Sequence, residues 1–481
     1  MLGTRATVLA LQHPVLWREI ALARGVWLGT LQLCLCSAIG AVILGVPLGF
    51  CLARGPKWLR FWGAVGCALP LGVPPVILAA PFVSASGKTG FPLFFSCLTL
   101  AMSFYPLVAL AGALAIRALP RGEEEAALLA SSPLRAWTGV LGRRIFPAIL
   151  GGAGAVGALC AWEMGAPDLL SQPSFGMSVY RALNSPQMLA PGESAARAWL
   201  AALGVPIIAL LFLLPAARAL RGLAAQTSSE SSPDEARLPW AGFGALVLLV
   251  SPGFILWQLF SALENVGAAQ TAIAANDDAI FNTLVTATVS AVFLPLGAAF
   301  LLSLWSVWPL KARRFALGAT LLPGLFAPVV IGVALIELWN RAALGAVYDS
   351  RLGMVLVGHF ARFFPLAIAL FWVPLSNLDP DLKRSAQNLG ASPLRAFWTT
   401  EIPALKGAIA GIAALIWALC AGELSVSVLV HGPGGDTLAI PIFGLLHAGI
   451  AADVAALCLL LMLLCGGAMA LAVVALGRKH E

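Results

Sequence analysis

The chain has 481 residues, of which 60% are apolar and 11% are charged, and its mean hydropathy is +0.91. A soluble fold needs roughly a quarter of its residues charged to cover its surface, so this composition excludes a soluble globular enzyme, a disordered chain and a nucleic-acid-binding domain. The net charge of +7 is instead typical of a membrane protein with basic cytoplasmic loops, and we expect an all-α polytopic membrane protein.

Eleven apolar stretches are long enough to cross a hydrocarbon core of about 30 Å as helices. In chain order they lie near 25–52, 59–83, 91–118, 145–163, 196–219, 240–262, 279–306, 315–338, 352–376, 405–430 and 452–476. The stretch at 221–239 is polar and Ser-rich, so we expect a cytoplasmic linker between two transmembrane halves, residues 1–220 and 240–481. Residues 1–24 are too charged for a clear span, which leaves twelve helices as an alternative.

The distribution of basic residues predicts how the chain crosses the membrane. If the C-terminus lies inside, most of the 29 Lys and Arg residues fall in inner loops, as the positive-inside rule requires. In this topology the two longest inner loops are residues 117–150 and 378–409. The N-terminus is the weak point, because Arg5, Arg18 and Arg24 would then lie outside.

The two inner loops and their flanking helices resemble each other at constant offsets. The matched runs are SPLRAW at 132–137 with SPLRAF at 392–397, ALCAWE at 158–163 with ALCAGE at 418–423, LPLGVPPV at 69–76 with LPGLFAPV at 322–329, and Thr30-Leu31 with Thr283-Leu284. Chance matches between Ala- and Leu-rich helices do not reproduce Ser, Pro, Arg, Cys and Glu at shared offsets. Both copies follow their third core span, so we predict a parallel tandem duplication.

Each inner loop opens with a proline and a charged turn, continues through a short helix-forming stretch and breaks at Ser-Pro. We expect a short helix lying across the membrane face, followed by a turn and a second helix. In that second helix Ser132 or Ser392 is the N-cap, and Pro133 or Pro393 occupies the first turn. The alternative is a pair of ordinary amphipathic loops.

The segment NLGASPLRAFWTTEIPAL at 388–405 resembles the EAA loop of binding-protein-dependent type I ABC import permeases. That loop reads roughly E-A-A-x-x-x-G, followed by a polar stretch, an aliphatic residue and Pro. Gly390 fills the glycine position, and Arg384 stands where the family has glutamate. In the first copy Glu124, Glu125 and Ala126 fill E-A-A, and Ala130 replaces the glycine. The tail at 422–449 resembles the fused two-half permeases of the ferric iron and thiamine branch.

This resemblance implies five core helices in each half, with the first helix of the second half as a peripheral addition. It implies that the two short helices dock on a dimer of ABC ATPases, which holds the ATP, so the chain itself is no enzyme and binds no cofactor directly. A periplasmic or lipid-anchored binding protein would deliver a small solute, ferric iron or thiamine-like, to the permease in the bacterial inner membrane. The further partner is membrane lipid, and no nucleic acid is expected. The expected docking residues are Glu124, Glu125, Ala126, Ala130, Ser132, Pro133, Arg135, Arg384, Gly390, Ser392, Pro393 and Arg395.

Charged residues at membrane depth are candidates for the translocation pathway or a gate. Glu163 and Glu423 occupy equivalent positions near the outer ends of their spans, and Arg362 lies near the middle of its span. A charge at such depth must face protein or a water-filled path. The alternatives are helix-end carboxylates for the two glutamates and a structural ion pair for Arg362.

Other patterns give no catalytic or metal site. The run GKTG at 87–90 lacks the earlier glycine of a phosphate-binding loop, and the nine cysteines form no CxxC pair. We therefore predict no catalytic residues and no bound metal. The leading rival to an ABC permease is an ion-coupled secondary transporter, which predicts inverted repeats and several buried acidic residues at the membrane midplane.

Overall fold

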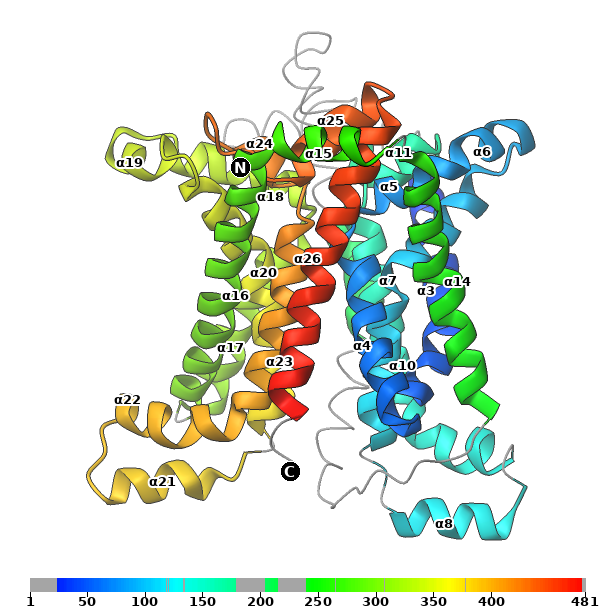
Figure 1. The fold of residues 1–481 in the computed structure, drawn as a ribbon. Coiled ribbons are helices and arrows are strands. Elements are labelled where there is room, and N and C mark those ends of the chain that lie inside the picture. The colour runs from blue at the N-terminus through cyan, green and yellow to red at the C-terminus, as the bar shows by residue number, and fades with distance from the viewer. Residues whose placement is uncertain are drawn as a thin grey trace. The chain divides into compact units, whose positions relative to one another are not determined.

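The computed structural model describes residues 24–117, 119, 121–132, 135–178, 204–214, 239–263, 265–306, 308–376 and 378–477. Within these ranges the backbone forms helices and turns and no strand. The chain divides into two compact units, Met1–Ala262 and Leu263–Glu481, and Figure 1 shows the helices of each. The possible extra helix in 1–24 and the expected linker at 221–239 lie outside the described residues, apart from Arg24 and Pro239.

Eight described helices are long and apolar enough to cross a membrane, or up to ten if each of two bent pairs counts as one span. They are α3 (Arg24–Arg54), α7 (Pro92–Arg117), α10 (Gly142–Trp162), α14 (Pro239–Ala262), α16 (Asp277–Trp305), α20 (Gly353–Ser376), α23 (Ile402–Ala421, counted with the helical turns before it) and α26 (Ala451–Gly477). The expected all-helical polytopic fold is confirmed. Of the expected span 196–219 the structure describes a short apolar helix at 204–214.

Two expected spans, 59–83 and 315–338, are each formed by a bent pair of helices. In the first, α4 (Lys57–Gly72) is followed by α5 (Pro75–Ala79) after a bend of 90°. In the second, α17 (Leu310–Leu321) and η3 (Leu322–Leu325) are followed by α18 (Pro328–Trp339) after a bend of 106°. Both breaks precede a proline, which removes a backbone donor and forces the residue before it into extended conformation.

Short elements complete each unit. In the first they are η1 (Ala80–Phe82), α6 (Val83–Thr89) and α11 (Gly165–Leu169), and in the second α15 (Val266–Ala274), η4 (Ala342–Leu344), α19 (Gly345–Tyr348), α24 (Ser427–Val430) and α25 (Ala439–His447). The expected span 405–430 is too long, because α23 ends at Ala421 and a turn leads into α24.

In the first unit α3 is the central helix and packs against α7, α10 and α14. Gly45 and Gly49 let α3 approach α7 closely, since a Cβ atom at Gly45 would lie 2.7 Å from the carbonyl oxygen of Tyr105. The sequence position of α14 places it in the second half, yet it packs against α3 and α4. The two transmembrane halves 1–220 and 240–481 stay a prediction; the compact units divide the chain after Ala262 instead.

In the second unit α16 packs against α20 and α23, and α26 covers α23. A separate apolar cluster joins α18, α20 and the segment after α23. Its buried members are Ile331, Leu335, Met354, Val426 and Val430.

Two local structures occur in both units. The first is a buried threonine on the first long helix: Thr30 Oγ1 accepts a hydrogen bond from Phe175 N at 3.1 Å, and Thr283 Oγ1 accepts one from Leu438 N at 2.7 Å. The second is a π-helical turn directly before a long helix, η2 (Ala136–Leu141) before α10 and η5 (Phe397–Glu401) before α23. Such π turns are uncommon and often lie at functional sites.

Candidate functional site

A short helix in each unit connects two long helices. In the first unit α8 (Arg121–Ala130) lies between α7 and η2. In the second, α21 (Pro380–Asn388) lies between α20 and α22 (Pro393–Ala396), which leads into η5. Figure 1 shows that each short helix runs across the end of its own unit's long helices.

Local sequence signals explain the shape of the second connection. The Asp379 carboxylate accepts a hydrogen bond from Asp381 N at 2.9 Å and caps α21, whose first residue is a proline. Gly390 has a φ of +86° and turns the chain after α21. The Ser392 side chain then accepts a hydrogen bond from Arg395 N at 3.3 Å, which confirms the predicted N-cap. Pro133 of the first copy lies outside the described residues.

The most exposed apolar side chains of both short helices lie at matching positions. Leu129 is 89% exposed at the end of α8, and Leu389 is 90% exposed directly after α21. They are separated by the same offset that relates the two SPLRA runs. Because a leucine is this exposed at the matching position of each short helix, the two positions are candidates for contact with another molecule. Sequence reasoning missed both leucines, although an apolar residue next to the glycine position of a polar helix was a usable signal.

Most of the residues expected to dock on a partner lie on the surface. Exposed members are Glu125, Ala126, Ala130, Ser132, Arg135, Arg384, Gly390, Ser392, Pro393 and Arg395. Arg384 pairs with Asp381 at 3.3 Å on the surface of α21. Glu124 is different: its carboxylate binds Arg54 at 2.5 Å, and both side chains are largely buried. The Glu124 side chain therefore faces the end of α3, and its contact with a partner stays a prediction.

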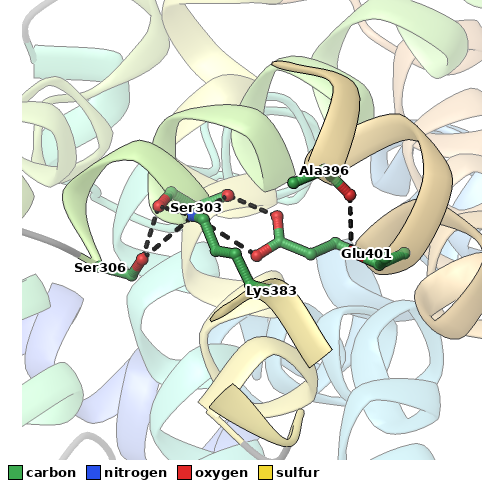
Figure 2. A network of polar contacts seen from close by, with 6 residues as sticks. Ser303, Ser306, Lys383, Ala396 and Glu401 are labelled. Atoms are coloured by element: carbon green, nitrogen blue, oxygen red, sulfur yellow. Dashed lines mark hydrogen bonds and ion pairs between the residues drawn. The ribbon is translucent and has the colours of Figure 1, made fainter. Parts of the chain in front are cut away.

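A buried polar cluster attaches α21 to the rest of the second unit (Figure 2). The ammonium group of Lys383 donates hydrogen bonds to the carbonyl oxygen and the hydroxyl of Ser303, each at 2.7 Å, and lies 3.5 Å from Glu401 Oε1. The Ser303 hydroxyl in turn donates a hydrogen bond to Glu401. The Lys383 side chain is 12% exposed and that of Glu401 is 5% exposed. Sequence reasoning named neither residue.

Position and charge both favour Lys383 at this place. Ser303 lies in the last turn of α16 and Ser306 directly follows that helix, where backbone carbonyl groups lack helical partners and carry the negative end of the helix dipole. Glu401 belongs to η5 and its side chain is 5% exposed, so a nearby cation is needed to stabilise its charge. One ammonium group therefore connects α21, α16 and the turn that begins α23.

The first unit holds a related contact between its short helix and the end of its first long helix. There the acidic partner, Glu124, lies on the short helix α8, and the basic partner, Arg54, is the last residue of α3. Arg117 also donates a hydrogen bond to the carbonyl oxygen of Leu52 near the end of α3, at 2.5 Å. In both units the short helix or its neighbour is thus bound to the C-terminal end of the first long helix.

The charged residues at membrane depth form local contacts. Glu423 is fully buried, pairs with Arg362, and accepts hydrogen bonds from Val426 N at 2.9 Å and from Ser427 N at 2.8 Å. The structural ion pair, one of the two alternatives for Arg362, is therefore present. Glu163 accepts a hydrogen bond from Gly165 N at 3.0 Å, so each glutamate also holds the turn that follows its helix. A role for these residues in a gate stays a prediction.

A buried histidine lies on α20 close to this ion pair. His359 is fully buried, and its Nδ1 lies 3.0 Å from the hydroxyl of Ser290 on α16. Among the described residues, no group of three or more His, Cys, Asp or Glu side chains is arranged to hold a metal ion. The GKTG run ends α6, with Gly90 at a φ of +70°, and precedes no phosphate-binding helix.

Known proteins with similar sequences are transport permeases. The chain is 32% identical to the molybdenum transport system permease protein ModB of Haemophilus influenzae, over 32% of this chain and 77% of that protein. It is 28% identical to the putative 2-aminoethylphosphonate transport system permease protein PhnV of Salmonella paratyphi A, over 44% of this chain and 77% of that protein. It is 23% identical to the Fe(3+)-transport system permease protein FbpB 2 of Haemophilus influenzae, over 86% of this chain and 82% of that protein. No protein-family model matches the chain.

Proposed function

The chain belongs to the non-catalytic permease subunits of ABC importers, which are multi-pass proteins of the bacterial inner membrane. From this premise we propose that it is a fused permease driven through two docking helices. In this proposal α8 and α21 bind one ABC ATPase each on the cytoplasmic side. ATP binds to these ATPases, and the permease holds no cofactor of its own. Membership in this family decides against the alternative of an ion-coupled secondary transporter.

The observation that carries the docking proposal is the pair of exposed leucines. Leu129 lies in the last turn of α8 and Leu389 directly follows α21, and each is accompanied by exposed charged residues such as Glu125 and Arg384. A largely apolar side chain with a polar rim is the usual composition of a protein-binding surface. Because the permease hydrolyses nothing, the free energy that changes its conformation must enter through contacts of this kind.

The proposal includes a parallel internal duplication. It is supported by the sequence matches, by the recurring threonine contact and by the π-helical turns that precede α10 and α23. It is also supported by the similarity to FbpB 2, which extends over 86% of this chain. Two similar halves in one polypeptide would present two docking helices to a symmetric ATPase dimer.

For the transported solute we propose ferric iron or a thiamine-like molecule, delivered by a periplasmic or lipid-anchored binding protein. The relative that matches both units is named as a ferric iron permease, and the tail at 422–449 resembles the same branch. The relatives named for molybdenum and 2-aminoethylphosphonate match less than half of this chain.

Uptake into proteoliposomes tests this function. We expect vesicles that contain the permease, its cognate ATPase and its binding protein to accumulate ferric iron or thiamine only when ATP is supplied on the ATPase side. Vesicles without the ATPase are the control and should show no accumulation. Uptake that needs no ATP and follows a proton or sodium gradient would contradict the proposal.

A further inference from the structure

The contacts of α21 raise the question of how motion at the docking helix reaches the membrane helices. The backbone of α21 packs against α22 and η5, which lie on the same side of the unit. The side chains of its neighbours Leu382 and Arg384 are exposed. The side chain of Lys383 instead reaches the end of α16.

The Lys383 ammonium group is held by several partners at once. It donates to two atoms of Ser303, lies 3.3 Å from the hydroxyl of Ser306, and pairs with Glu401. Both charged side chains are nearly buried, so separating them leaves a charge without solvent. A displacement of α21 therefore has to carry the end of α16 and the start of α23 with it, or break this cluster.

The cluster lies next to a π-helical turn. Glu401 is the last residue of η5, and α23 begins at the following residue. A π turn inserts an extra residue into the helix and changes the direction of the side chains beyond it. This turn is also a place where the helix can change its hydrogen bonding without losing its continuity.

The first unit makes the corresponding attachment with different residues. Glu124 on α8 pairs with Arg54 at the end of α3. In the second unit Lys383 on α21 reaches the end of α16 through Ser303, and its acidic partner Glu401 belongs to η5. In both units a charged side chain of the short helix is thus bound to the end of the first long helix, although the partner groups differ.

We propose that Lys383, Glu401 and Ser303 in the second unit, and Arg54 and Glu124 in the first, are positioning residues that transmit movement of the docking helices to the membrane helices. This inference rests on the proposed function, because it takes α8 and α21 to be the docking helices. The two attachments would not contribute to binding the ATPase. They would determine how much transport each ATP hydrolysed produces.

The test separates docking from transmission in the second unit. Lys383→Met removes the ammonium group, Lys383→Arg retains a charged donor, and Lys311→Met is a matched control at an exposed lysine on α17 of the same unit. Each variant is reconstituted with the ATPase and the binding protein. Three quantities are measured: ATPase bound per permease, ATP hydrolysed and solute imported.

For Lys383→Met we expect ATPase binding within about twofold of the wild type and solute imported per ATP lower by about tenfold, a typical size for coupling between sites. Lys383→Arg should restore most of the ratio of solute imported to ATP hydrolysed, and Lys311→Met should leave this ratio unchanged. If Lys383→Met proves too unstable to purify, Glu401→Gln provides the second test. The glutamine keeps an acceptor for the Ser303 hydroxyl but loses the charge that pairs with Lys383. We expect this variant also to import less solute per ATP hydrolysed than the wild type.

The outcomes distinguish this inference from the function on which it rests. If the wild-type chain neither binds the ATPase nor imports solute with ATP, the proposed function is wrong. If the wild type imports solute and the Lys383→Met and Glu401→Gln variants keep its ratio of import to hydrolysis, the transmission role is wrong. The transmission role would also be wrong if import by these variants fell only in proportion to weaker ATPase binding.

Discussion

A permease in which Leu129 and Leu389 are both replaced with serine is expected to bind its ATPase about a hundredfold more weakly than the wild-type chain. Each leucine is about nine-tenths exposed in the permease alone. Burying a leucine side chain in a partner's groove contributes about 1.5–3 kcal/mol, and each 1.4 kcal/mol changes affinity about tenfold. Each single variant should therefore lose about tenfold. Binding can be measured by titrating purified ATPase against labelled permease in detergent.

The control for this experiment is Val266→Ser. Val266 is 75% exposed at the start of α15, and in Figure 1 α15 and α21 lie at opposite ends of the second unit. This variant should bind the ATPase like the wild type, because its side chain is equally apolar but far from the docking helix. Wild-type affinity in the double leucine variant would show that the exposed leucines do not form the docking surface.

Replacing Arg362 with methionine is expected to lower the free energy of unfolding by about 3–5 kcal/mol, the usual loss when one partner of a buried ion pair is removed. The reason is that Glu423 is fully buried and would remain without its cation, while Arg362 is 21% exposed. Such a loss is a large part of a total stability of about 5–15 kcal/mol. Denaturant unfolding in detergent, followed by tryptophan fluorescence, measures it.

Glu423→Gln is the matched variant for the other partner. It keeps the size of the side chain and can still accept a hydrogen bond from Val426 N. Arg362, being partly exposed, can turn toward polar surroundings, so we expect a loss of about 1–2 kcal/mol only. If Arg362→Met unfolds like the wild type yet imports no solute, the ion pair is not structural and Arg362 belongs to the translocation pathway.

Much of the helical framework follows from the length of the apolar runs. The expected spans 25–52 and 91–118 correspond to α3 and α7 within two residues at each end, because a helix must continue until the chain becomes polar. Prolines such as Pro75 and Pro328 indicate possible kinks within their spans, but the sequence does not give the size of the two bends, 90° and 106°. A proline can kink a helix or end it, and the outcome depends on the packing around it, which apolar length does not record.

The sequence predicted that the two short helices exist, but not which of their side chains are buried and which are exposed. Capping residues such as Ser392 indicated the short helices correctly, since these signals act within a few residues. Which face of a helix is covered depends on partners far along the chain: Glu124 binds Arg54, 70 residues away, and Lys383 reaches Ser303, 80 residues away. For the same reason Leu389 could be taken for an ordinary apolar residue of an amphipathic helix, although the structure leaves it exposed.

The most direct test of the account asks on which side of the membrane the two docking helices lie. Leu129→Cys and Leu389→Cys variants can each be treated with a membrane-impermeant maleimide in right-side-out and in inverted membrane vesicles. We predict that both cysteines react in inverted vesicles and are protected in right-side-out vesicles, because both helices face the cytoplasm. Labelling of the two positions from opposite sides would contradict a parallel duplication and, with it, a permease driven through two docking helices.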